Sequence, residues 1–383
     1  MKILHLCLAC FYIDKYSYQE NLLPKEHKKC GFDVRIIAST ETFVDGINLG
    51  YIKPSKYENE NNIIVERIPY VSWLPSKIVH KLRIYPKVYE KIDEFSPDII
   101  FIHECQFLSI LQVVKYAEKH PQVKIFVDGH ADFSNSARGF ISRNILHRLI
   151  YRFCAQKILP YTTKFWGTLP ARVDFFHNVY GIPKEKIDFL PMGADDDMIA
   201  KHNSLKEKEE TKNKFGFSSN DFIIVSGGKI DFAKTQTLLL MGAVNELEKK
   251  NVKLLVFGSV DKQLKERFDS LCSDRVKYAG WANVDDSYRY FGIADLVVFP
   301  GRHSVYWEQV AGMGIPMIVK YWPGTTHIDR GGNVKFLYED TVDEIKEVVK
   351  DIFFNGELEK MESVAQNNKR FFSYRNIAER CIE

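Results

Sequence analysis

The stretch FIIVSGGKIDFAKTQTLLLMGAVNELEKK, residues 222–250, runs from an apolar segment through two glycines into a long helical segment. Its first part, FIIVSGGKI (222–230), predicts a buried strand, and residues 235–250 predict a helix. A second apolar run, VKLLVFGSV (252–260), follows directly. A strand, a helix and another strand in this order are typical of a parallel βαβ unit.

The same alternation extends over most of the chain. In the second half it predicts a helix at 262–272 and strands at 276–280, 295–300 and 316–320. In the first half it predicts strands at 1–10, 32–39, 62–70, 97–103 and 123–130, with helices near 22–31, 87–95 and 107–120. We therefore predict the α/β class, with two doubly wound Rossmann-like domains that face a central cleft.

The length of 383 residues also favours two domains. The almost entirely polar segment KHNSLKEKEETKNK (201–214) is typical of a linker or a short surface helix. We expect a first domain at 1–198, a charged linker at 199–215, a second domain at 216–365 and a C-terminal segment at 366–383.

Composition narrows the function classes. Hydrophobic residues make up 45% of the chain and charged residues 27%, as in a soluble globular protein, and the net charge of +3 gives no support to a nucleic-acid partner. Seven scattered cysteines favour a reducing compartment over a disulfide framework. With no signal peptide or membrane span visible, we expect a cytoplasmic protein that could touch the inner face of the cell membrane.

The turn GGKIDFAKT (227–235) predicts an anion site. Gly227 and Gly228 allow close approach of the backbone, Lys229 and Lys234 bracket the turn, and a helix begins directly after it. A diphosphate would suit two cations and a helix N-terminus. The turn is neither a Walker A sequence nor GxGxxG, which argues against ATP hydrolysis and NAD binding. Two solvated lysines beside a turn are the alternative.

A second polar group follows the predicted strand at 294–300, in the stretch PGRHSVYWEQVAGMGIP (300–316). Open parallel sheets bind ligands beyond the carboxyl ends of their strands, and this stretch lies there. Its hydrogen-bonding groups are Arg302, His303, Ser304, Tyr306, Trp307, Glu308 and Gln309. In the alternative interpretation Tyr306 and Trp307 are core aromatics and Glu308 is a charge at a helix start.

The order of these segments resembles one known family. The sequence GGKIDFAK, KLLVFGS, DRVKYAGW, IADLVVFP and EQVAGMGIPMIV is similar to the C-terminal domain of family four of the retaining glycosyltransferases, which have the GT-B fold. KIDFLPMGAD (186–195) resembles the family's P-x-G-x-D segment between the domains, and FFSYRNIAER (371–380) resembles the C-terminal helix that crosses back to the first domain. The resemblance covers nearly the whole chain.

The resemblance implies roles for the anion-site lysines. Lys229 and Lys234 stand at the Arg and Lys positions of the family's G-R-x-x-x-x-K turn, which grips the donor diphosphate together with the backbone near Gly228. Trp281 stands where the family's chain passes the nucleotide base, and either stacking or packing would explain it. His130, just beyond the strand at 123–130, matches a histidine that often meets the donor hexose; a structural loop histidine is the alternative.

The chain departs from the family in the stretch at 300–316. The family's second glutamate falls on Gln309, with Glu308 directly before it, and no acidic residue fills the first glutamate position. This resembles the variant HSVxWEQ of some bacterial surface-polysaccharide transferases. We expect Glu308 to hold the ribose, because a carboxylate can accept from both hydroxyls, and His303 and Ser304 to meet the sugar and phosphate.

The resemblance implies a complete reaction. A hexose-type sugar would pass with retention from a nucleotide diphosphate donor, a UDP-sugar rather than a GDP-sugar, to a saccharide or lipid-linked saccharide acceptor. No metal or cofactor is expected, and Lys229, Lys234 and His130 would be catalytic. The loop after the first strand would hold the acceptor through Tyr18, Gln19, Glu20 and Asn21. HECQF (103–107) could meet either substrate.

Two other interpretations of the whole chain stay open. A non-catalytic protein of the same fold could bind sugar nucleotides or glycans after losing the glutamate pair. A GT-B epimerase would need carboxylates in the cleft that the sequence does not place.

Two further segments each allow two interpretations. Asp195, Asp196 and Asp197 could be a metal-binding DxD, but we expect a solvated turn at a domain junction. Ile141, Ile145, Leu149 and Phe153 form one helical stripe among Arg138, Arg143, Arg148 and Arg152. A basic amphipathic helix can lie on an anionic membrane, or its stripe can pack in the core, and we favour the core.

Overall fold

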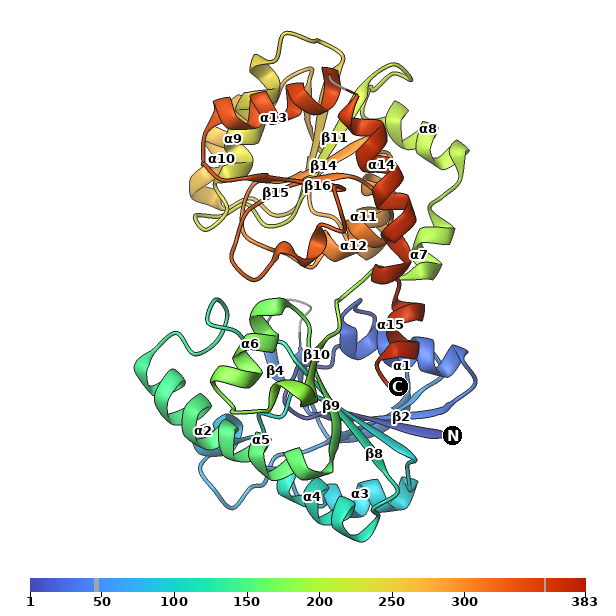
Figure 1. Ribbon diagram of the computed structural model, residues 1–383, viewed down its shortest axis with the longest axis vertical. Helices are drawn as coiled ribbons and strands as arrows, with labels where there is room; N and C mark the ends of the chain where they lie inside the picture. The colour runs from blue at the N-terminus through green and yellow to red at the C-terminus, as the bar shows by residue number, and fades with distance from the viewer. Residues whose placement is uncertain (45–47, 355) are drawn as a thin grey trace. The chain divides into compact units, whose positions relative to one another are not determined.

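The computed structural model describes residues 1–44, 48–354 and 356–383. Two compact units divide the described chain: the first comprises Met1–Pro191 with Ile377–Glu383, and the second comprises Met192–Asn376 (Figure 1). The division therefore falls earlier than the expected boundary at 198, and the final segment returns to the first unit later than 366.

A mostly parallel sheet forms the centre of the first unit. Its order is β10-β9-β8-β7-β1-β2-β6-β5, and only β5 among these described strands runs antiparallel to its neighbour. The strands are β1 (Lys2–Cys7), β2 (Asp33–Ser39), β5 (Ser55–Glu58), β6 (Ile64–Ile68), β7 (Ile99–His103), β8 (Lys124–Gly129), β9 (Thr162–Gly167) and β10 (Ile187–Phe189). Separately, β3 (Glu41–Phe43) pairs antiparallel with β4 (Leu49–Tyr51).

Helices pack on this sheet. They are α1 (Gln19–Lys29), α2 (Ser76–Leu82), α3 (Val88–Phe95), α4 (Ile110–Lys119), the π-helix η1 (Ile141–Tyr151), α5 (Arg152–Ile158), α6 (Pro170–Asn178) and the short 3₁₀ turns η2 (Leu159–Tyr161) and η3 (Lys184–Lys186). Along β1 the side chains alternate: Leu4 and Leu6 enter the main core with Val127 and Phe165. His5 therefore lies on the other face of the sheet.

The second unit contains a fully parallel sheet in the order β13-β12-β11-β14-β15-β16. Its described strands are β11 (Phe222–Gly227), β12 (Val252–Phe257), β13 (Val276–Tyr278), β14 (Leu296–Phe299), β15 (Met317–Lys320) and β16 (Val334–Leu337). The chain moves outward from β11 to β13 and then returns to the other side of β11 with β14. This reversal creates a topological switch point between β11 and β14, where such sheets bind ligands.

Side chains alternate across this sheet too. Ile224 and Leu254 belong to the core on one face, and Val225 and Leu255 to the core on the other. The helices are α7 (Asp196–Lys201), α8 (Leu205–Lys214), α9 (Gln236–Glu246), η4 (Lys262–Leu264), α10 (Lys265–Leu271), α11 (Val284–Phe291), α12 (Tyr306–Gly312), η5 (Thr326–Ile328), α13 (Val342–Phe354), α14 (Glu357–Asn368), η6 (Lys369–Phe372) and α15 (Tyr374–Arg380), which passes into the first unit.

The predicted class, α/β with two doubly wound Rossmann-like domains, is confirmed. The polar segment 199–215 contains the end of α7 and all of α8 and belongs to the second unit. None of the helices in the described ranges has both the length and the apolar character needed to cross a bilayer.

The core placement that we favoured for the 138–157 stripe is wrong. Ile141 and Leu149 are 66% and 63% exposed, and Ile145 and Phe153 are also exposed. Helical periodicity showed that these side chains share one face, but that face packs against no core. The burial comes instead from the opposite face, through residues such as His147 and Tyr151.

Candidate functional site

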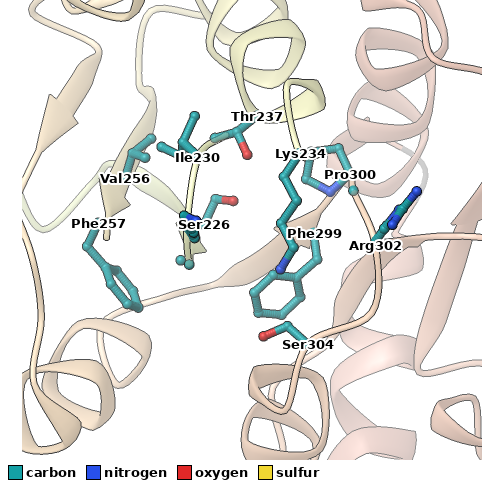
Figure 2. A pocket seen from close by; sticks show the side chains of 14 residues that line it. Ser226, Ile230, Lys234, Thr237, Val256, Phe257, Phe299, Pro300, Arg302 and Ser304 are labelled. Carbon is teal, nitrogen blue, oxygen red and sulfur yellow. The ribbon is translucent and has the colours of Figure 1, made fainter. Parts of the chain in front are cut away.

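Two loops of the second unit meet at the switch point. One loop joins the end of β11, Gly227, to the start of α9, and the other joins the end of β14, Phe299, to the start of α12. Between them lies an open pocket. Its lining, most of which is labelled in Figure 2, comprises Ser226, Gly227, Gly228, Lys229, Ile230, Lys234, Thr237, Val256, Phe257, Phe299, Pro300, Gly301, Arg302 and Ser304.

Glycine is required where the β11–α9 loop approaches the loop after β12. Gly228 has φ +128° and Gly258 has φ +123°, a region that other residues rarely adopt. A Cβ on Gly258 would lie 2.0 Å from the carbonyl oxygen of Gly228. This close packing therefore fixes the position of the Gly228 backbone, which lines the pocket.

The pocket collects positive charge. Figure 2 shows the Lys234 side chain extending toward Ser304. Burial lowers the pKa of Lys234, the positive charges of Arg302 and Lys229 lower it further, and Asp231 opposes them. Lys229 is more exposed and lies 3.3 Å from Asp231. Helix α9 begins at Gln236 without a side-chain cap, so its positive dipole end adds to the field.

In the described part of the chain Lys234 and Arg302 form no ion pair with a carboxylate. A partly buried ammonium without a counter-ion is costly, and an anionic ligand would relieve that cost. The arrangement can therefore bind a phosphate or diphosphate. The sequence places Arg302 among the hydrogen-bonding groups at this strand end, but it did not predict a role for Arg302 in the anion site.

Glu308 and Gln309 are not part of the lining of this pocket. The Glu308 carboxylate is fully buried, and its Oε1 accepts hydrogen bonds from His303 Nε2 at 2.8 Å and His327 Nε2 at 2.9 Å. Gln309 is also buried and donates to Ser287 Oγ at 3.1 Å. Neither residue lines the pocket, so contact with a ribose there would require the covering side chains to move.

The two histidines keep Glu308 ionised. Burial alone would raise the pKa of Glu308, but the imidazoles of His303 and His327 outweigh it and lower this pKa to about 2. Glu308 Oε2 has no hydrogen-bond partner among the described residues. His327, in the loop after β15, was missed in the sequence because nothing local marks it.

This same trio could hold a metal ion. One ligand atom from each of His303, Glu308 and His327 lies within 4.8 Å of the others, and two imidazoles with a carboxylate are a ligand set that zinc accepts. The two imidazole-to-carboxylate hydrogen bonds account for this proximity without a metal.

Three other candidates of the second unit lie elsewhere. Trp281 is 71% exposed and does not line the pocket, whereas Trp307 is fully buried in the core. The solvated turn expected at 195–197 is wrong for Asp195, which is buried and caps α7 by accepting from Asp197 N–H at 3.0 Å.

In the first unit His130 follows β8 and is about a quarter exposed, with Nε2 3.6 Å from Asp128 Oδ2. Burial would lower the pKa of His130, but the Asp128 carboxylate outweighs burial and raises it. The His130 backbone N–H donates to Glu104 Oε1 at 2.6 Å. His103, from the same HECQF segment as Glu104, is fully buried.

The four acceptor candidates divide into two pairs. Gln19 and Asn21 are buried and already bonded within the unit, to Asp128 Oδ2 and to the Ile13 carbonyl respectively, both at 2.9 Å. Tyr18 is exposed and Glu20 half-buried. Only the second pair is therefore accessible to a ligand in this conformation.

Residues 207–371 match the family model described as glycosyl transferases group 1. Across 99% of the chain, the fold is similar to that of Anabaena Alr3699/HepE in complex with UDP, with a TM-score of 0.69, 16% identity and 98% of that chain covered. WaaG, a glycosyltransferase involved in lipopolysaccharide biosynthesis, has a TM-score of 0.65 at 14% identity, with 99% and 98% covered. The chain has the GT-B fold.

Two named proteins are also similar to the chain in sequence. An uncharacterized glycosyltransferase of Methanocaldococcus jannaschii is 23% identical over 301 residues, which are 74% of this chain and 73% of that protein. Mannosylfructose-phosphate synthase of Agrobacterium fabrum is 27% identical over 176 residues, 42% of this chain and 36% of the synthase. The GT-B part of the predicted resemblance is confirmed by the similarity of fold to Alr3699/HepE and WaaG.

Proposed function

We propose that the protein is a glycosyltransferase that moves a hexose-type sugar from a nucleotide diphosphate donor to a saccharide or lipid-linked saccharide. The observation that carries this proposal is the cationic pocket at the β11/β14 switch point, where Lys234 and Arg302 have no carboxylate partner among the described residues. A diphosphate matches the charge, and the match of residues 207–371 to group 1 transferases supports the reaction class.

The donor is proposed to be a UDP-sugar rather than a GDP-sugar, with no cofactor or metal. Alr3699/HepE was solved with UDP, with UDP and glucose, and with UDP-glucose, which supports this choice by similarity of fold alone. Lys229, Lys234 and the start of α9 would bind the diphosphate, with Gly228 and Ser304 nearby. Trp281, which is exposed, is proposed to contact the nucleotide base, and His303 is proposed to contact the sugar.

In the proposed reaction the bond from the sugar C1 to the donor phosphate oxygen breaks, and a bond from C1 to the acceptor hydroxyl oxygen forms on the same face. The hydroxyl proton passes to the departing phosphate oxygen. Lys229 and Lys234 stabilise the negative charge that grows on the diphosphate, which is the main catalytic effect. His130 is proposed to contact the hexose. The acceptor is proposed to contact Tyr18 and Glu20, which lie beside Gln19 and Asn21.

A role in cell-surface polysaccharide synthesis, at the inner face of the membrane, is part of the proposal. Its support is an exposed apolar surface on η1 and α5, made of Phe140, Ile141, Ile145, Leu149 and Phe153. Arg143, Arg148 and Arg152 alternate with these residues, and a basic amphipathic face binds anionic lipid. Leu149→Asp should reduce sedimentation with anionic vesicles, and Leu205→Asp, at an exposed leucine of α8, should not.

The experiment that tests the function measures both binding and turnover. Purified protein is titrated with UDP and GDP by calorimetry and then incubated with UDP-glucose to follow release of UDP. Saturable UDP binding with slow donor hydrolysis supports the transferase. Binding without any hydrolysis supports a non-catalytic sugar-nucleotide or glycan-binding protein instead, and absence of binding to either nucleotide refutes the diphosphate site.

A further inference from the structure

Three histidines form a buried row in the first unit. His27 belongs to α1, His5 to the central strand β1 and His103 to the end of β7. All three are at most 1% exposed. Their rings lie close together, with centroids 5.2 Å apart from His27 to His5 and from His5 to His103. We call this row the histidine chain.

Each ring nitrogen of the histidine chain has a partner. His27 Nε2 lies 2.9 Å from the carbonyl oxygen of Ala378. Along the row, His27 Nδ1 is 3.0 Å from His5 Nε2, and His5 Nδ1 is 3.0 Å from His103 Nε2. At the other end His103 Nδ1 is 2.9 Å from Asp128 Oδ2. Four hydrogen bonds therefore join three rings between two oxygen atoms.

The number of protons in this row follows from its two ends. A carbonyl oxygen cannot donate, so His27 Nε2 must carry a hydrogen; an ionised carboxylate cannot donate either, so His103 Nδ1 must carry one. Each of the two contacts between rings needs one hydrogen as well. The four bonds need four ring protons, whereas three neutral imidazoles supply three. One ring in the row must therefore be an imidazolium.

The row could do without an imidazolium only if Asp128 were protonated and supplied the fourth hydrogen itself. The surroundings of Asp128 argue against that. Besides His103, its Oδ2 accepts from Gln19 Nε2 at 2.9 Å and its Oδ1 accepts from the Glu104 backbone N–H at 3.2 Å. Three donors on one carboxyl group stabilise the ionised form.

The electrostatic balance places the charge at the Asp128 end. Burial lowers the pKa of His103, but the Asp128 carboxylate outweighs burial and raises this pKa to about 9. Burial lowers the pKa of His27 to about 4 and also lowers that of His5. Cys7 and Glu20 also raise the pKa of His103. Cys381 Sγ lies 3.6 Å from His27 Nε2, but its thiol donates to the Ala378 carbonyl oxygen at 3.3 Å. His27 Nε2 therefore still needs its own hydrogen to reach that oxygen.

We propose that the histidine chain holds one proton beyond its neutral complement, and that this buried cation makes Asp128 a positioning residue for Gln19 and His130. The imidazolium lies next to a fully buried carboxylate and balances its charge. Asp128 can then hold α1 through Gln19 and face the His130 ring across 3.6 Å. The protonation state itself does not depend on the proposed function.

Ring ¹⁵N chemical shifts of histidine-labelled full-length protein test this directly. At about pH 7.5, one unit above the ordinary histidine pKa of about 6.5, an imidazolium should persist in this row, and His103→Gln assigns its signals. Three neutral rings in the wild-type protein would overturn the proposal, and this spectrum decides it even if a variant fails to fold.

Asp128→Asn gives a second, independent test. The asparagine N–H can donate to His103 Nδ1, so four bonds would then need only the three protons of neutral rings. The imidazolium signal should disappear at the same pH while the tautomers of His5 and His27 remain. Asp93→Asn, at the exposed partner of His120, is the matched control and should leave the buried signal unchanged. Persistence of the imidazolium in Asp128→Asn would show that Asp128 does not balance it.

Discussion

Lys234→Ala should weaken donor turnover far more than Lys229→Ala. Lys234 is partly buried in the pocket and has no carboxylate partner among the described residues, so its full charge is available to a diphosphate. Two unit charges 4 Å apart interact by about 4 kcal/mol at an effective dielectric constant of 20, and by about 1 kcal/mol in water. The Lys229 side chain is 67% exposed and 3.3 Å from Asp231, which places it near the lower limit.

These limits convert into rates. Loss of about 3 kcal/mol of transition-state stabilisation in Lys234→Ala corresponds to roughly a 10²-fold fall in kcat/KM, and about 1 kcal/mol in Lys229→Ala to roughly fivefold. The assay is UDP release from the donor, with UDP affinity measured by calorimetry.

Lys262→Ala is the matched control, because this lysine is exposed on the same unit and outside the pocket. It should leave both kcat/KM and UDP affinity unchanged, and all three variants should keep the wild-type Tm. If Lys234→Ala binds UDP as the wild type does, or if Lys229→Ala is the more damaged variant, the reasoning from burial and pairing is refuted.

Three further outcomes are expected. Glu308→Gln should destabilise the fold by about 2 kcal/mol, because two imidazole donors lose a charged acceptor. Gln309→Ala should destabilise it by about 1 kcal/mol, because only one hydrogen bond between neutral groups is lost. Urea unfolding measures both values. Gly258→Ala should lower Tm and UDP affinity together, because its Cβ would meet the Gly228 carbonyl oxygen at 2.0 Å. Stability should fall as pH rises from about 6.5 to about 9, since folding raises the pKa of His103 to about 9, with a loss of ~3 kcal/mol that urea unfolding across this range measures.

Each of these has a contrary result. Equal destabilisation by the Glu308 and Gln309 variants would remove the charge argument, and lower UDP affinity in Glu308→Gln with unchanged stability would favour ribose binding at Glu308. Normal nucleotide affinity in Gly258→Ala would show that nucleotide binding does not depend on the backbone packing at Gly258. The direction of the pH effect follows from the raised pKa of His103. Its contribution to stability is fully present below about pH 6.5, where the folded and unfolded states both bind the proton, and is lost as pH rises toward the folded-state pKa. A rise in stability toward alkaline pH would contradict it.

Much of the fold could be predicted because buried parallel strands are continuous apolar runs. The strands at 97–103 and 252–260 were placed close to β7 and β12 for this reason. By contrast β9, TTKFWG, begins with two threonines and a lysine, and its place between β8 and β10 depends on pairing partners far away in the chain. Periodicity alone does not contain that information.

The site was predicted only where it is local. Lys229 and Lys234 share one turn, so their approach to a common pocket could be inferred from seven consecutive letters, GKIDFAK. Arg302 reaches the same pocket because β14 pairs with β11, and His327 reaches Glu308 from the loop after β15. Both contacts depend on the order of the strands in the sheet. The sequence predicted a doubly wound parallel sheet but not its strand order.

The two buried carboxylates differ in a way that only proton counting reveals. Glu308 receives two imidazole nitrogens on one oxygen, so two bonds need two protons, and two neutral rings supply them. Asp128 ends a row that needs one proton more than its rings supply, so its charge is cancelled. The two bonds at Glu308 therefore require no proton beyond those of two neutral rings, whereas the row that ends at Asp128 requires one more.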